Sequence, residues 1–143
     1  MKKITIIGSG FSALSASCYL AKSGYDVTIF EKNATIGGRA RQMKAAGFTC
    51  DMGPSWYWMP DIFERFFADF NKKPSDYYEL IKLSPAYRVY FGINDFIAIA
   101  DNLDEIVTTF ENIEKGSGKV LRAFMAEAQS NYDIAIKDLV YRP

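Results

Sequence analysis

Two short apolar runs near the start of the chain flank a longer segment of helical character. Residues 3–7 and 25–30 are rich in β-branched and aromatic side chains, which is typical of strands. The segment between them, residues 11–23, predicts a helix that Gly24 ends. The pattern therefore predicts a strand, a helix and a second strand, which is the order of a parallel βαβ unit.

Glycines interrupt the next 25 residues, and helical spacing returns after them. Residues 31–55 are expected to form an extended loop that carries short strands. Residues 61–70 then predict an amphipathic helix, because apolar side chains recur on one face while charged side chains occupy the other. The apolar positions are Ile62, Phe63, Phe66, Phe67 and Phe70.

The last third of the chain predicts one hairpin and two helices. Residues 87–91 and 96–100 are strand-like runs on either side of a Gly-Ile-Asn-Asp turn. Asn102, followed three residues later by Glu105, resembles a capping box at the start of an amphipathic helix. The Gly-Ser-Gly run at 116–118 should end that helix, and a long helix is expected from Lys119 to about Leu139.

Composition narrows the function classes without naming one. The chain has 143 residues, 49% of them hydrophobic and 24% charged, as in an ordinary globular domain. Its 17 basic and 17 acidic residues balance, which argues against a nucleic-acid partner. Histidine is absent, and Cys18 and Cys50 lack metal-ligand or redox-pair spacing, so no metal site is predicted. No stretch approaches the roughly 18 apolar residues of a membrane span. Both cysteines are expected to be reduced, as in a cytoplasmic protein.

The turn between the first predicted strand and helix carries the most informative motif. It reads Gly8, Ser9, Gly10, Phe11, Ser12 and Ala13. Gly8 permits a tight turn, and Gly10 lets the backbone approach a pyrophosphate without a clashing Cβ atom. Ala13 keeps the helix close to the strand, so the unpaired N–H groups of the first helical turn can face phosphates. These features predict an adenine-dinucleotide site, against the alternative of a chance glycine turn.

An acidic residue stands where this motif requires one. Glu31 follows the second strand, about twenty residues after the glycine turn. Its carboxylate can accept hydrogen bonds from the hydroxyls of the adenosine ribose. Because a carboxylate there would repel a 2′-phosphate, NADP is disfavoured.

Two further glycine segments extend the motif. Gly37 and Gly38 are followed by Arg39, whose guanidinium can offer a planar pair of donors to a phosphate. Residues 47–56 bring more glycines and end in Gly53, Pro54, Ser55 and Trp56. A plain turn is the alternative interpretation of the doublet. A glycine doublet directly after the ribose-binding acid is nevertheless typical of flavin oxidoreductases of the amine-oxidase type.

Taken together, these motifs give a resemblance to a known family. Gly8-x-Gly10-x-x-Ala13, residues 30–33, residues 37–40, Gly47-Phe48-x-x-Asp51-x-Gly53-Pro54 and Met59-Pro60 resemble the amino-terminal portion of bacterial-type carotenoid (phytoene) desaturases. The ending at residues 140–143 is also similar to a segment of that family. This family is part of the FAD-dependent, amine-oxidase-like superfamily. The resemblance covers nearly the whole chain but only about the front third of a family member.

The resemblance implies non-covalent FAD and a lipophilic polyene substrate from which hydride is removed to introduce a double bond. By this analogy Ser9 to Ala13 would hold the pyrophosphate, Glu31 and the following Lys32 would lie at the adenosine end, and Arg39 would lie beside the phosphates. Residues 53–56 would line the region near the flavin ring. No residue receives a catalytic role, because the flavin accepts the hydride.

The predicted fold class is α/β, with a Rossmann-like FAD-binding βαβ unit followed by an α+β segment of a hairpin and helices. Two parallel strands are too few for the open sheet of such a fold. We therefore expect the chain to be the front part of a longer protein and incomplete without a carboxy-terminal part. Residues 1–60 are assigned to FAD binding, and residues 61–143 to the start of a substrate-side region.

Three alternatives stay open from the sequence. The first is another flavoprotein of the superfamily, such as a carotenoid ketolase or isomerase, a protoporphyrinogen oxidase or an amine oxidase. The second is a non-redox binding protein on the same scaffold, as in the Rab GDP-dissociation inhibitors. The third concerns the aromatic cluster at residues 56–70, which is ordinary core or a hydrophobic entrance for a substrate taken from the membrane. Peripheral association with the inner face of the membrane belongs to this last interpretation.

Overall fold

The computed structural model describes residues 1–53 and 56–139. The chain divides into two compact units, Met1–Pro74 and Ser75–Pro143, which we describe separately. A short 3-10 turn, η2 (Pro74–Asp76), stands at their boundary. The division expected at residue 60 concerns cofactor and substrate roles rather than compactness, so it stays a prediction.

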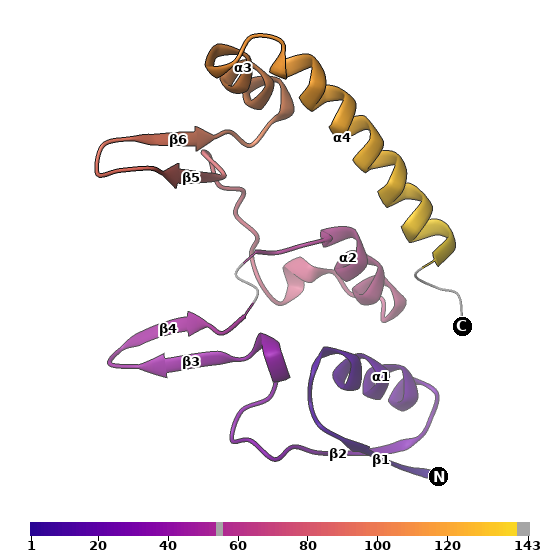
Figure 1. The fold of residues 1–143 in the computed structure, drawn as a ribbon. Helices are drawn as coiled ribbons and strands as arrows, with labels where there is room; N and C mark the ends of the chain where they lie inside the picture. The colour runs from indigo at the N-terminus through magenta and orange to yellow at the C-terminus, as the bar shows by residue number, and fades with distance from the viewer. Residues whose placement is uncertain (54–55, 140–143) are drawn as a thin grey trace. The chain divides into compact units, whose positions relative to one another are not determined.

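The first unit opens with the predicted βαβ arrangement (Figure 1). Strands β1 (Lys3–Ile7) and β2 (Asp26–Phe30) pair in parallel, and α1 (Phe11–Lys22) connects them. Half-buried and exposed residues alternate along both strands, as expected of a pair with one covered face. Gly24 has φ of +84° directly after the helix, and its N–H donates to the carbonyl of Ala21. The predicted helix stop is thereby confirmed.

The glycine-rich stretch forms the short strands expected of it. A 3-10 turn, η1 (Gly38–Ala40), precedes an antiparallel hairpin of β3 (Gln42–Ala45) and β4 (Phe48–Asp51). The two residues at the tip, Ala46 and Gly47, both have positive φ. This backbone is that of a tight two-residue hairpin turn, whose twist matches that of the flanking strands.

Helix α2 (Pro60–Asp69) closes the first unit and packs through its aromatic face. Proline at the first helical position suits the start of the helix, because its fixed φ is helical and its missing N–H would be unpaired there. The Tyr19 ring of α1 lies 5.8 Å from that of Phe66 and 5.1 Å from that of Phe70, and the Phe11 ring lies 6.1 Å from that of Phe63. These contacts support the core interpretation for this face of the helix.

The second unit begins with the expected hairpin. Strands β5 (Tyr87–Tyr90) and β6 (Phe96–Ile99) pair antiparallel in a register that opposes Tyr87 to Ile99 and Tyr90 to Phe96. Helix α3 (Leu103–Ile113) follows, and the Asn102 Oδ1 atom accepts from the Glu105 backbone N–H at 2.9 Å. The Asn102 amide also donates to the Glu105 carboxylate at 2.7 Å, so the predicted cap is confirmed.

The last helix begins earlier than the sequence predicted. Helix α4 (Ser117–Ile134) starts inside the Gly-Ser-Gly run, and a π-helical turn, η3 (Ala135–Leu139), continues it. The Glu111 carboxylate accepts from the backbone N–H groups of Gly116 and Gly118, both at 2.9 Å. A side chain of the preceding helix thus satisfies donors at the start of α4, which stabilises a helix that has no local cap.

Candidate functional site

The glycine turn between β1 and α1 has the geometry that the motif predicts. Gly8 adopts φ of +94°, which favours glycine, and its N–H donates to the carbonyl of Phe30 at 2.7 Å. Gly10 then returns to extended backbone and forms the N-cap of α1. A Cβ atom built on Gly10 would meet no protein atom within 4 Å. The backbone therefore presents an open face at the helix start.

The N-terminus of α1 is suited to an anion. Gly10 provides no side-chain cap, and the first turn contains no acidic residue. Its N–H groups therefore lack the side-chain acceptors that commonly satisfy them, and the helix dipole favours negative charge at this end. Of the predicted residues here, Phe11 and Ser12 are exposed and Ala13 is half-buried. The Phe11 side chain contacts α2 rather than the open face.

Glu31 is tied to the glycine turn by hydrogen bonds from two residues. The backbone N–H and the hydroxyl of Ser9 both donate to Oε2, each at 2.8 Å. The backbone N–H of Asn33 donates to Oε1 at 2.9 Å, and its side-chain amide donates to the same atom at 2.7 Å. These bonds, first the one from the Asn33 backbone N–H and then the one from the Ser9 hydroxyl, lower the pKa of Glu31 to about 2. The carboxylate is therefore ionised throughout the neutral range.

This pKa predicts how acid affects stability. The hydrogen bonds of ionised Glu31 contribute to the free energy of unfolding. This contribution is fully present above the ordinary pKa of 4.5, and it is lost as the pH falls towards about 2. Glu31→Gln should remove it at every pH, because the amide must turn its N–H₂ group towards the donors of either Ser9 or Asn33. Urea unfolding of both proteins at pH 6 and pH 3 checks this. The stability difference between them should shrink at pH 3, and a difference independent of pH would contradict the prediction.

The glycine doublet lies directly against the glycine turn. The Gly37 N–H donates to the Ser9 carbonyl at 2.9 Å, and Gly37 forms an isolated parallel bridge with Gly10. Gly38 has φ of +60°, and a Cβ atom there would lie 3.1 Å from the Gly10 Cα atom. Gly38 is thus favoured by the close approach of the two backbone segments. Gly37 is favoured by its φ of +104° and by the turn that follows it, where a Cβ atom would lie 3.2 Å from the Ala40 carbonyl oxygen. Arg39 follows with an exposed side chain, and it forms no ion pair with any residue in the described ranges.

The third glycine segment, which contains Gly53, contacts the backbone directly after the glycine doublet. Gly53 has φ of +118°, and a Cβ atom on it would lie well inside 3.0 Å of the Arg39 carbonyl oxygen. Lys32 is exposed, and Trp56 has a relative exposure of 57%. Pro54 and Ser55, which were also predicted at the site, lie outside the described residues. The structure therefore brings the glycine turn, the doublet and Gly53 together within the first unit.

Sequence reasoning missed how Glu31 is held. The resemblance implies that Ser9 holds the phosphates, yet both of its donors bind the Glu31 carboxylate and the residue is only 2% exposed. Asn33 received no role, although it supplies two of the four bonds. The one available signal was that asparagine two residues after an acid can turn back to bond it, as such side chains commonly do in loops.

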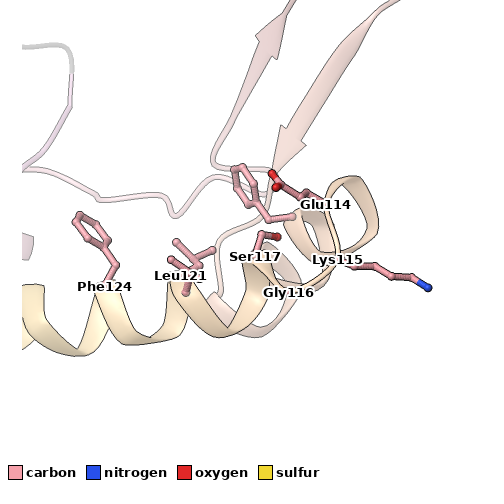
Figure 2. Close-up of a pocket in the computed structure, with 8 residues that line it drawn as sticks. Glu114, Lys115, Gly116, Ser117, Leu121 and Phe124 are labelled. Carbon is pink, nitrogen blue, oxygen red and sulfur yellow. The ribbon is translucent and has the colours of Figure 1, made fainter.

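A separate depression lies in the second unit, between the end of α3 and the start of α4. Figure 2 shows Leu121 and Phe124 projecting from the same side of α4, with Ser117 beside them, while Lys115 extends away. The depression is open and partly apolar, and it includes none of the predicted site residues. We assign the candidate site to the glycine segments of the first unit.

The chain is similar to several known proteins. Residues 6–72 match the family of NAD(P)-binding Rossmann-like domains. The chain is 45% identical over 139 residues to the carotenoid 3,4-desaturase of Haloarcula japonica. It is 41% identical over 133 residues to the 4,4'-diapophytoene desaturase (4,4'-diaponeurosporene-forming) of Staphylococcus aureus. The chain is homologous to carotenoid desaturases.

This homology has a defined extent. The alignments cover 97% and 93% of the chain but only 28% and 26% of the two desaturases, so the chain spans about a quarter of their length. An oxidoreductase from Methanosarcina mazei shares the fold, with a TM-score of 0.54 and 18% identity over 92% of this chain and 31% of that one. The predicted resemblance to the desaturases and the predicted α/β Rossmann-like class are confirmed. Within the part of the chain that the structure describes, no helix is both long and apolar enough to cross a membrane.

Proposed function

We propose that this chain forms the dinucleotide-binding part of an FAD-dependent carotenoid desaturase. The observation that carries the proposal is the uncapped start of α1, which opens beside an ionised Glu31 in a chain homologous to carotenoid desaturases. The residues fit such a ligand, because the Gly10 backbone faces open space that a Cβ atom would fill. The acid at residue 31 also favours FAD or NAD over a cofactor with a 2′-phosphate.

Each segment of the site would hold one part of FAD. Residues 10–13 would bind the pyrophosphate through backbone N–H groups, since the N–H groups of Gly8 and Ser9 already donate to Phe30 and Glu31. Glu31 with Lys32 would meet the adenosine end. Arg39 is exposed and available to a phosphate oxygen. Residues 53–56 would approach the flavin ring. The motif and the geometry of the turn support the pyrophosphate and ribose assignments, whereas those of Lys32 and residues 53–56 rest on the resemblance to the desaturases.

The substrate would be a lipophilic polyene such as a phytoene-like carotenoid precursor. FAD, when bound, supplies the hydride acceptor for the new double bond. The part played by this chain is then to bind the cofactor, fix its orientation and keep water away from one side of it. Such a role needs no acid or base from this chain, which agrees with its lack of histidine.

The direct test is the absorption spectrum of the purified protein at its natural full length. A flavin spectrum, bleached when the polyene is added under anaerobic conditions, is the expected result. Colourless protein that FAD cannot reconstitute would contradict the proposal. A flavin spectrum that amines or porphyrinogens bleach, and polyenes do not, would favour another flavoprotein of the superfamily.

We further propose that the protein is cytoplasmic and associates with the inner face of the membrane through the aromatic segment before α2. Trp56 and Trp58 have relative exposures of 57% and 68%, and their rings lie 6.3 Å apart. Tyr57 instead packs on Phe63, at 4.8 Å between ring centroids. Two exposed indole rings held by a packed neighbour are suited to a lipid interface.

Paired variants separate this role from core packing. Phe66→Ser with Phe67→Ser should lower the free energy of unfolding by about 2 kcal/mol per ring, because two half-buried rings are lost. The Phe66 ring packs on Tyr19 of α1, and the Phe67 ring packs on Phe66. Trp56→Ser with Trp58→Ser should leave stability nearly unchanged and weaken flotation with liposomes. Urea unfolding and flotation check both pairs. If the Phe66 and Phe67 variant kept its stability and alone lost liposome binding, the proposed role of Trp56 and Trp58 at the membrane would be contradicted.

A further inference from the structure

The Glu31 carboxylate is saturated with hydrogen bonds before any ligand arrives. A carboxylate offers about four lone-pair positions. Ser9 fills the two on Oε2, and Asn33 fills the two on Oε1. A ribose hydroxyl can therefore donate to Glu31 only by replacing a donor that is already present.

The four donors differ in how readily they can leave. Two are backbone N–H groups, whose positions are fixed by the turn; Ser9 is held further by the bond from Gly37 to its carbonyl. The Ser9 hydroxyl belongs to a residue that is 2% exposed, so water could not satisfy it after displacement. Asn33 is exposed, and its amide can exchange the carboxylate for water at little cost. The Asn33 amide is thus the donor that can leave.

We propose that the Asn33 side-chain amide occupies the position on Glu31 that a ribose hydroxyl of the adenosine takes in the complex. This inference rests on the proposed dinucleotide binding and makes Asn33 a competitor of the ligand. In the free protein its amide donates to Oε1 of Glu31 at 2.7 Å. On binding, the amide is displaced, so the ligand competes with a group of the protein itself.

The ligand can bind only to those molecules in which the Asn33 amide has left Glu31. The apparent affinity is therefore the intrinsic affinity multiplied by the fraction of molecules in that state. Asn33→Ala removes the competitor but keeps the other three bonds to Glu31, since alanine retains the backbone N–H. The variant should therefore bind hydroxyl-bearing ligands about 3- to 10-fold more tightly. Ligands without ribose hydroxyls should bind both proteins equally.

The experiment is a calorimetric titration of flavin-free, full-length protein with ADP and with 2′,3′-dideoxy-ADP. We expect Asn33→Ala to raise the affinity for ADP about 3- to 10-fold and to leave the affinity for the dideoxy compound unchanged. Asn94→Ala, which changes an exposed asparagine of the β5–β6 turn, is the matched control and should gain for neither. If the substitution acted through a general structural change, it would alter the affinities for both ligands by the same factor, and that result would contradict the inference.

Two further results would overturn the inference, and they are distinguishable. If the wild type binds ADP and FAD but Asn33→Ala binds ADP equally or more weakly, Asn33 does not compete and the inference fails alone. If the wild type binds neither ligand, the proposed function fails and the inference fails with it. Melting curves of each variant establish that all the titrated proteins are folded.

Discussion

Gly53→Ala should reduce the free energy of unfolding by about 3 kcal/mol and abolish retention of FAD. Alanine at φ of +118° is strained, a cost of roughly 1–2 kcal/mol. Its Cβ atom would also overlap the Arg39 carbonyl oxygen, so one of the two backbone segments must move. Because Arg39 follows the doublet that lies against the glycine turn, movement there disturbs the proposed phosphate site. Urea unfolding and the flavin content of the purified variant measure the two effects.

Gly47→Ala is the matched control for this prediction. Gly47 also has positive φ, at +80°, but a Cβ atom there meets nothing within 4 Å. The control therefore carries the backbone strain without the overlap, and it should cost about 1–2 kcal/mol while retaining FAD. Equal losses in the two variants would show that strain alone accounts for Gly53 and that its approach to Arg39 is unimportant.

The elements could be predicted from the sequence because their signals are local. The βαβ unit shows its strand runs, its glycine turn and the Gly24 stop within 30 residues. The hairpin of β5 and β6 and the cap at Asn102 likewise depend on residues only a few positions apart. The glycine motif also predicted the tight turn and the open start of α1, since the conformations of Gly8 and Gly10 depend mainly on the turn itself.

The contacts that could not be predicted join residues distant in the chain or depend on an unforeseen side chain. No local signal shows that Gly37 will bond to the Ser9 carbonyl, or that Ser9 will direct both donors to an acid 22 residues later. The start of α4 was misplaced for a related reason, because Glu111 of another helix supplies its cap. Sequence patterns indicate where a backbone can turn, whereas tertiary packing determines which distant residues it contacts at that turn.

The glycines of the site therefore fall into two kinds. Gly38 and Gly53 are required by the fold, since a Cβ atom on either would crowd a neighbouring backbone. Gly10 is different, because its φ is −73° and the space beside it is open. The protein itself gives no reason for glycine at this position, so the reason must be sought in what binds there.

Gly10→Ala should consequently separate folding from binding. Alanine adopts this backbone without strain, and its less favourable N-cap preference costs under about 1 kcal/mol. The new methyl group would occupy the space through which the pyrophosphate approaches the helix N-terminus. We expect the affinity for FAD and for ADP to fall at least 100-fold, or about 2.8 kcal/mol, with little change in the urea midpoint.

The control for Gly10→Ala is Gly92→Ala, in the β5–β6 turn of the second unit. Gly92 also lacks positive φ, and a Cβ atom there would make only an ordinary 3.6 Å contact with the Asp95 side chain. It should change neither stability nor affinity appreciably. If Gly10→Ala instead bound FAD as tightly as the wild type, the turn would not approach a pyrophosphate, and the site would have to be assigned elsewhere. If it failed to fold, Gly10 would belong with Gly38 and Gly53, and the open face would not mark a binding site.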